Sequence, residues 1–233
     1  MTIKENDSLL SLRSFFKSPM GRSAFLAIVI FLIMEIPVRL LLQPDPWLLS
    51  PDHWYFKQPP RTLIELLLVG MLIFLNWRFY PRLLIVDPKH IGLLIGTMIG
   101  SLMLFGALEF GQLKSSFQQP ISIWMFWLVT GFCIGIGQEL LYRGLLYSAL
   151  SSYLKKNIAS LLTTITFVAA PLHSVRLWNY GMQNEWTAVI LLVAIFCAAS
   201  VFFQWLREKT NSVVVPALAH GVGNAVTWVA VFS

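Results

Sequence analysis

The residues best suited to chemistry stand in the middle of an apolar stretch. Between Pro120 and Leu154 the sequence reads Gln138-Glu139-Leu-Leu-Tyr-Arg143. Glu139 and Arg143 are four residues apart, so on a helix they share a face and can form an ion pair. Ionisable side chains at membrane depth are costly unless they are paired or solvated, and such a pair indicates a functional site. The alternative is a buried ion pair that only fixes helix packing.

His173 is expected at the same depth as this pair. A turn over 154–157 joins two apolar spans into an antiparallel hairpin. Glu139 lies sixteen residues before Lys155, and His173 lies sixteen residues after Asn157. At 1.5 Å per residue, both side chains are roughly 24 Å from the turn. Pro171 is expected to disturb the helix next to His173, which is tolerated at membrane depth only where protein or water satisfies the freed carbonyls.

The last apolar span brings two further polar side chains to one helix face. His220 and Asn224 are four residues apart, with Gly221 and Gly223 between them to allow close packing. Together a histidine and an asparagine can donate two hydrogen bonds to one oxygen, as an oxyanion site requires. The alternative is a pair of interhelical hydrogen bonds.

Composition defines the elements that must position these residues. The 233-residue chain is 57% hydrophobic and only 12% charged, whereas a soluble domain carries about 25% charged residues. The apolar runs are continuous over helix length, which excludes a β-barrel and predicts an all-α, polytopic transmembrane bundle. The net charge of +6 indicates topology and lipid contact, not nucleic-acid binding. Cys133 and Cys197 lie in apolar runs and are interpreted as packing residues.

Seven spans are predicted, and the basic residues orient them. With the N-terminus inside, eleven Lys and Arg fall in inner segments and four, Lys57, Arg61, Lys114 and Arg176, in outer ones. The bias predicts an N-inside, C-outside protein, in which 1–22 is a retained cytoplasmic segment. A loop over 44–61, rich in Pro and Trp, is expected at the interface. The spans are predicted at 23–43, 62–80, 91–110, 121–153, 158–175, 186–206 and 212–232.

Three motifs in order resemble the CPBP family, also called Abi, of CAAX prenyl endopeptidases and bacteriocin-processing intramembrane proteases. The family's Glu-Glu-x-x-x-Arg corresponds to Gln138-Glu139-Leu-Leu-Tyr-Arg143, and its His-x-x-x-Asn corresponds to His220 and Asn224. Its Phe-x-x-x-His ends here at His173, with Phe167 two places too early. The resemblance divides the chain into N-terminal transmembrane helices over 23–119 and a catalytic core over 120–233.

The resemblance implies hydrolysis of a peptide bond in a membrane-associated, prenylated or unprenylated, protein or peptide. His173 would orient or deprotonate water, His220 and Asn224 would hold the oxyanion, and Arg143 would support the site through Glu139. No cofactor is required by this scheme. Zinc or another divalent ion is an open alternative, with His173, His220 and Glu139 as ligands, although the compact His-x-x-x-His spacing is missing.

One departure from the family pattern affects activity directly. Gln138 stands where the family has its water-activating Glu, and an amide cannot accept a proton at neutral pH. Glu139 points about 100° away on a helix, so it can replace that base only if the helix is locally turned, which Gly135 and Gly137 permit. Three interpretations stay open: an active site with Glu139 as base, a catalytically impaired relative, or a Glu-to-Gln change made to trap an inactive form.

Two other classes of function compete with the protease. A non-enzymatic membrane adaptor would keep the scaffold and cleave nothing. A small transporter or proton-relay protein would use four carboxylates, but these are scattered over four helices without an inverted repeat. We expect a multi-pass protein of a bacterial inner (plasma) membrane, with membrane lipid and a protein or peptide substrate as partners. The carboxylates of the transporter alternative are Glu35, Glu65, Glu109 and Glu139.

Overall fold

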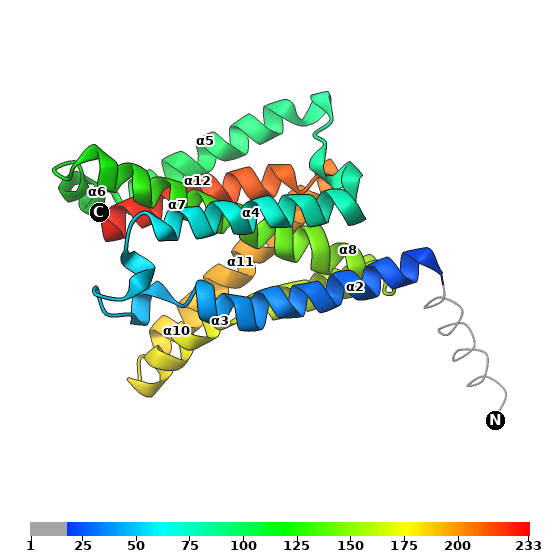
Figure 1. Ribbon diagram of the computed structural model, residues 1–233, viewed down its shortest axis with the longest axis horizontal. Coiled ribbons are helices and arrows are strands. Elements are labelled where there is room, and N and C mark those ends of the chain that lie inside the picture. Colours follow the sequence, from blue (N-terminus) through cyan, green and yellow to red (C-terminus); the bar gives the residue numbers. More distant parts are fainter. Residues whose placement is uncertain (1–17) are drawn as a thin grey trace.

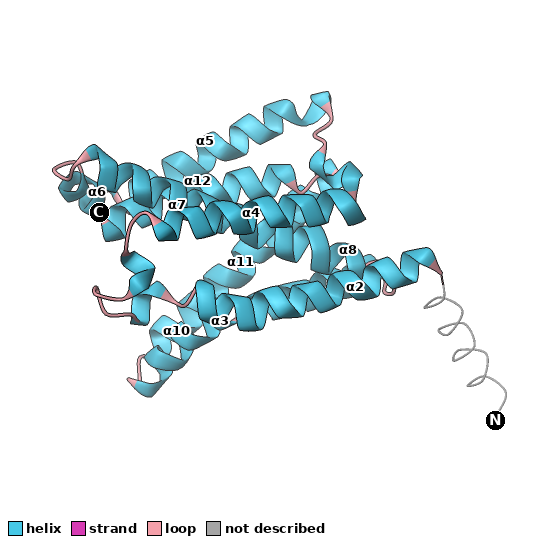
Figure 2. Cartoon of the chain, in the orientation of Figure 1, coloured by secondary structure: helices cyan, strands magenta, loops and turns pink. Residues whose placement is uncertain are grey.

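The computed structural model describes residues 18–233, and helices form the whole regular structure of that range (Figures 1 and 2). The all-α prediction is therefore confirmed. Most of the predicted cytoplasmic segment 1–22 lies outside the described residues. In chain order the α-helices are α2 (Pro19–Ile33), α3 (Arg39–Leu42), α4 (Pro60–Phe79), α5 (Ile91–Leu108), α6 (Phe110–Ser116), α7 (Ile121–Glu139), α8 (Tyr147–Leu150), α9 (Lys156–Val168), α10 (Pro171–Met182), α11 (Trp186–Thr210) and α12 (Val214–Phe232).

Within the described residues, six helical stretches are long and apolar enough to cross a membrane. They are Met20–Leu48, Pro60–Phe79, Pro88–Leu108, Ile121–Leu150, Trp186–Thr210 and Val214–Phe232. The predicted fifth span, 158–175, is not one helix. It consists of α9 and α10, bent by 56° at the break before Pro171, where the proline ring occupies the first position of α10. The predicted number of seven membrane spans holds if the bent pair α9–α10 counts as one span.

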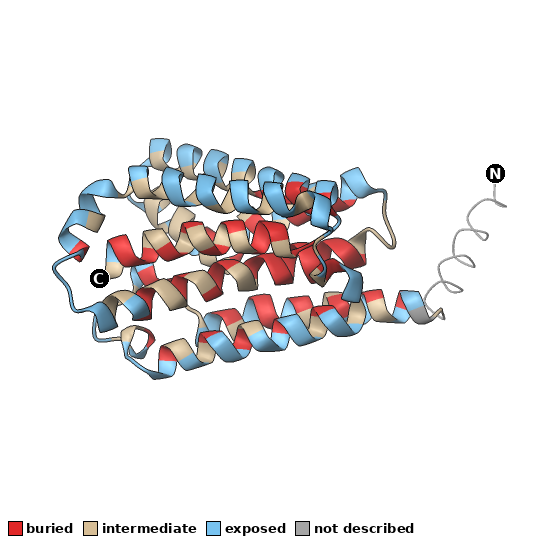
Figure 3. Cartoon of the chain, turned by 90° about the horizontal axis from the view of Figure 1, so that it is seen from above, coloured by how far each residue is buried: buried red, intermediate tan, exposed pale blue. Residues whose placement is uncertain are grey.

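The centre of the bundle is the contact between α7 and α12, which belong to the two most buried of the six spans. Figure 3 shows that the buried residues gather on the inner helices of the bundle. Glycines bring the two backbones together. A Cβ placed on Gly135 would lie 2.8 Å from the backbone of Gly221, and one on Gly131 would lie 2.7 Å from the carbonyl oxygen of Asn224. Because residues four apart share a helix face, this close approach also turns Glu139 toward α12.

A π-helical segment, η6 (Leu140–Leu146), interrupts the long fourth span directly after the Gln138-Glu139 pair. The irregularity therefore begins within the motif, after Glu139, and not at Gly135 or Gly137, where the sequence allows a bend. The buried Asn76 of α4 stabilises it by donating Nδ2–H to the carbonyl oxygen of Leu140, at 3.0 Å. Such π segments occur often at functional sites.

A second set of buried charges ties the N-terminal helices together. Arg39 pairs with Glu35 at 3.1 Å in the π-helical segment η1 (Met34–Val38) and its continuation, as their four-residue spacing suggests. Glu65 is fully buried and forms an ion pair with Arg61, four residues earlier on α4. Gln43 also donates to Glu65 at 2.5 Å. These carboxylates are thus held in ion pairs and do not line a shared path.

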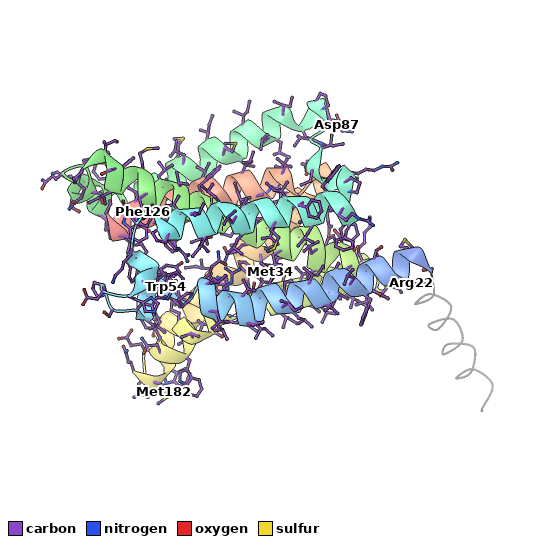
Figure 4. All side chains as sticks on the ribbon, viewed as in Figure 1. Arg22, Met34, Trp54, Asp87, Phe126 and Met182 are labelled. Atoms are coloured by element: carbon purple, nitrogen blue, oxygen red, sulfur yellow. The ribbon has the colours of Figure 1, made fainter. Side chains whose placement is uncertain are left out.

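The labelled residues mark the two ends of the bundle. Figures 1 and 4 place Arg22 and Asp87 at one end and Trp54, Phe126 and Met182 at the other. The loop 44–61 and the C-terminus share the second end, where the loop forms two short 3-10 turns, Pro46–Leu48 and Trp54–Phe56.

Candidate active site

A cavity of about 240 Å³ lies between α7, α10, α11 and α12. Four of the side chains predicted from the sequence line it: Gln138, His173, His220 and Asn224. They come from three helices that are distant in sequence, and the α7–α12 contact and the α9–α10 bend bring them to one space. The remaining walls are largely apolar and aromatic, with Phe105, Ile134, Leu172, Ile195, Phe196, Phe203 and Trp228 among them.

His173 lies in the first turn of α10, immediately after the bend. Its Nδ1 is 2.7 Å from the backbone carbonyl oxygen of Phe167, and its ring stacks on Phe196 with centroids 4.1 Å apart. A carbonyl oxygen can only accept a hydrogen bond, so Nδ1 carries the proton of the neutral ring. Nε2 then keeps its lone pair, and it has no hydrogen-bond partner among the described residues. The bond and the stacking fix this ring as a proton acceptor at the cavity.

His220 is fixed in a similar way on α12. Its Nδ1 lies 2.8 Å from Oε1 of Glu139, and its ring stacks on Phe203 with centroids 4.6 Å apart. The carboxylate accepts the Nδ1 hydrogen and leaves Nε2 for the cavity. A carboxylate behind an imidazole sets its tautomer and orientation, and stabilises the positive charge of an imidazolium that forms during a reaction.

Glu139 and Arg143 support His220 from behind the cavity and do not line it. Both side chains are fully buried, and Arg143 Nη1 lies 3.1 Å from the same Glu139 oxygen that binds His220. Nη2 of Arg143 donates to the backbone oxygen and the hydroxyl of Ser200 on α11, at 3.0 and 2.8 Å. The Ser200 hydroxyl in turn donates to Thr164 on α9, at 3.0 Å. The ion pair is thus anchored to two further helices.

Gln138 and Asn224 present uncommitted amides to the cavity. Neither side chain is hydrogen-bonded to any other described residue, although Gln138 is only 4% exposed. Gln138 is adjacent to Glu139 but about 100° further round the helix, so the glutamine faces the cavity and the glutamate faces α12. Each amide has two N–H donors and one acceptor oxygen, which suits binding of a peptide carbonyl or N–H group.

The proposed metal ligands do not fit a metal site. The described residues contain no group of three His, Cys, Asp or Glu side chains arranged to hold an ion. Two of the three candidates, His220 and Glu139, bind each other, and Glu139 also binds Arg143. The Nδ1 of His173 is occupied by a backbone carbonyl. These side chains are engaged by other protein groups, so they do not converge on a position where an ion could bind.

Several cavity residues are not apparent from the motifs. Arg176, Trp47 and Thr227 line the cavity together with the motif residues. Arg176 is three residues after His173, so its position on the same helix face follows from helical spacing. Thr227 is likewise three residues after Asn224. Trp47 comes from the loop 44–61, and no sequence signal connects that loop to residues more than a hundred positions away.

The helical bundle places histidine and amide side chains in one cavity between its helices, as the motif resemblance to intramembrane proteases implies. Residues 120–226 match the family model described as type II CAAX prenyl endopeptidase Rce1-like. Over this region the chain is similar to the Rce1-like CAAX proteases, in agreement with the resemblance that the three motifs predict. No curated protein and no solved structure matches the chain. The family match begins one residue before α7 and ends within α12, so it covers every motif residue of the cavity.

Proposed function

We propose that this protein is an intramembrane endopeptidase whose general base is His173. The substrate is a membrane-associated protein or peptide, with or without a prenyl group, and the host is a bacterial inner membrane. One observation carries the proposal: two histidines with free Nε2 atoms and two uncommitted amides line the same cavity. General acid–base catalysis needs such a positioned acceptor, and binding the reacting carbonyl needs such donors.

The reaction runs through water held at His173. Nε2 takes a proton from the water, and the resulting hydroxide attacks the carbonyl carbon of the scissile bond. Asn224 donates a hydrogen bond to the developing oxyanion, and so does His220 when its Nε2 is protonated. Collapse of the tetrahedral intermediate breaks the C–N bond, and His173 returns its proton to the departing amine. The Gln138 amide orients the peptide beside these groups.

Glu139 and Arg143 act through His220 and not on water. Glu139 holds the Nδ1 hydrogen of His220 and compensates a positive charge on that ring, as a carboxylate does in a catalytic triad. Arg143 holds the Glu139 carboxylate on the α12 side through their ion pair. In this scheme both are positioning residues. The sequence left open whether Glu139 activates water, and we assign that role to His173.

The amide of Gln138 limits the rate of peptide hydrolysis, because it cannot accept a proton from water. A general acid–base group contributes about 10²–10⁴ in rate, so a carboxylate in place of this amide is expected to raise turnover by that order. Gln138→Glu would place a second proton acceptor beside His173 in the cavity. The protein as it stands is therefore expected to be slow.

The second candidate is a membrane adaptor that binds peptide and does not cleave it. A specific observation favours this class: among residues 18–233 no carboxylate lines the cavity, and the amide of Gln138 is a binding group and not a base. Both candidates use the same cavity and the same ligands. They differ only in whether His173 suffices to activate water.

The deciding experiment is a cleavage screen with the purified protein in lipid, read by mass spectrometry, on a peptide library that includes farnesylated C-terminal peptides. The protein is compared with His173→Ala, Gln138→Glu and, as a control, His90→Ala in a loop. Cleavage that is lost only in His173→Ala, and rises in Gln138→Glu, supports the proposal. Activity confined to Gln138→Glu identifies an adaptor on an intact protease scaffold. Activity that survives His173→Ala would overturn His173 as the base.

A further inference from the structure

A second pocket lies away from the candidate active site, between the connection that joins α4 to α5 and the turn that joins α11 to α12. Its volume is about 560 Å³, and none of its lining residues lines the active-site cavity. One carbonyl oxygen, that of Leu83, ties the two segments together. It accepts the backbone N–H of Val213 at 2.9 Å and the hydroxyl of Ser212 at 3.0 Å. The pocket is therefore formed by fixed backbone and does not depend on a ligand.

The lining of this pocket is mainly cationic. Among the described residues it contains three basic side chains and one acid: Arg82, Lys89, Lys209 and Asp87. Asp87 pairs with Lys89, with Oδ2 2.9 Å from Nζ. Arg82 and Lys209 form no ion pair or hydrogen bond with any residue in the range 18–233, and the Nζ of Lys209 only lies over the ring of Trp205, 5.4 Å from its centroid. Two cations thus remain available to an anionic ligand.

The length of α11 places the pocket at the depth of the lipid headgroups. Its 25 residues make a helix of roughly 37 Å, whereas the hydrocarbon core is about 30 Å thick. The last turn, which carries Lys209, therefore extends beyond the hydrocarbon. Trp205 lies one turn earlier and is 46% exposed, and exposed tryptophans are enriched at the membrane–water interface.

The pocket is also open to the surrounding lipid. It lies where α5 begins, and no residue of α5 is buried by other parts of the described structure. Figure 1 shows α5 at the outer edge of the bundle, and Figure 4 labels Asp87 at its start. Ile85 lines the pocket and is 66% exposed. Cations beside an exposed apolar side chain match a lipid, whose charged headgroup adjoins its acyl chains.

We propose that this pocket binds the phosphate of an anionic phospholipid from the membrane leaflet at this end of the bundle. The guanidinium of Arg82 can donate two parallel hydrogen bonds to phosphate oxygens, and Lys209 adds a point charge. Basic pockets between transmembrane helices bind anionic headgroups in this way. Basic residues can also serve only to orient a membrane protein, but that role needs neither a pocket nor two segments tied together.

The test compares two lipids on the same protein by native mass spectrometry. The delipidated full-length protein in detergent is mixed with equal amounts of phosphatidylglycerol, which is anionic, and phosphatidylcholine, which is zwitterionic, of the same chain length. The ratio of the two singly bound complexes gives the relative affinity. Arg82→Gln combined with Lys209→Gln removes the two available cations. Lys155→Gln combined with Lys156→Gln is the matched control, because both lysines are exposed in the turn before α9, which the alternation of the spans puts on the same membrane side.

Each basic side chain near a membrane surface contributes about 5-fold to the affinity for anionic lipid. With two available cations, phosphatidylglycerol should bind roughly 25-fold more tightly than phosphatidylcholine. The ratio should fall close to one when Arg82 and Lys209 are replaced and stay unchanged in the lysine control. Without added lipid, both double variants should melt with the wild type, because the four side chains are exposed. A ratio near one in the wild type, or equal losses in both double variants, would overturn the site.

Asp87→Asn tests the sign of the charge effect in the same pocket. The asparagine oxygen can still accept the backbone N–H of Lys89, as the Asp87 carboxylate does at 3.1 Å, but it no longer neutralises the lysine. The lipid ratio should therefore rise by about 5-fold. An unchanged or lower ratio would contradict recognition by charge.

Soluble competitors distinguish a lipid from a free anion. Inorganic phosphate or glycerol phosphate, added at the same molar concentration as the lipid, should leave phosphatidylglycerol bound, because neither carries acyl chains. Displacement of the lipid by either compound would show a site for soluble phosphate and overturn the lipid assignment. Peptide cleavage plays no part in these measurements, so their outcome is independent of the proposed function.

Discussion

Removing Arg143 should destabilise the protein far more than removing its neighbour in the motif, Gln138. Arg143 is fully buried and donates three hydrogen bonds, one to Glu139 and two to Ser200. In Arg143→Ala the Glu139 carboxylate keeps only His220 as a partner, because its second oxygen is buried with no hydrogen bond to a described residue. Breaking one side of a buried ion pair costs about 3–5 kcal/mol.

Gln138→Ala is expected to cost about 1 kcal/mol or less, because that side chain lines a cavity and loses no protein hydrogen bond. For a domain of this size, each kcal/mol shifts the melting temperature by roughly 2–4 °C. Arg143→Ala should therefore lower Tm by roughly 6–20 °C, and Gln138→Ala by roughly 4 °C or less.

The assay is thermal unfolding of the purified variants in one detergent, followed by tryptophan fluorescence. Arg143→Lys is the matched variant, since it keeps the positive charge but not the fork that binds Ser200, and should lie between the wild type and Arg143→Ala. Arg82→Ala, an exposed arginine, should melt with the wild type. Equal melting temperatures for Arg143→Ala and Gln138→Ala would refute the view that the ion pair holds the bundle together at this depth.

Three further predictions test packing, topology and metal dependence. Gly135→Ala should lower Tm and reduce peptide binding, because its Cβ would meet the backbone of Gly221, whereas Gly92→Ala on the open face of α5 should be neutral by the same measurements. In a variant without native cysteines, Lys57→Cys should react with a membrane-impermeant maleimide added outside intact cells, and Arg82→Cys only after lysis; the reverse pattern would contradict the N-inside orientation. Adding EDTA should leave Tm unchanged, and a large drop on chelation would argue for a structural metal.

The sequence alone was sufficient to predict the helical class, most spans and the motif residues that reach the cavity. Long apolar runs are read directly as membrane helices, and polar residues inside them are rare enough to be noticed individually. Equal offsets from one turn placed His173 near the depth of the Gln138-Glu139 pair. The family match over 120–226 confirms the resemblance inferred from those motifs.

The pairing of Glu139 with His220 depended on tertiary structure. The sequence shows that Glu139 and Arg143 share a face, but only the contact of α7 with α12 turns Glu139 toward His220 and leaves Gln138 at the cavity. That contact depends on the distances between two glycine-lined backbones, and helical periodicity carries no information on which helix lies opposite.

The cavity mouth was likewise decided by the fold. The spacing of Arg176 from His173 is local and readable in the sequence, because one helix sets it. The approach of Trp47 and Asp45 is not, since a loop more than a hundred residues earlier in the chain supplies them. Local spacing therefore determined which side chains can act together within each helix. Packing between distant segments decided which of them face the cavity and which of them only support it.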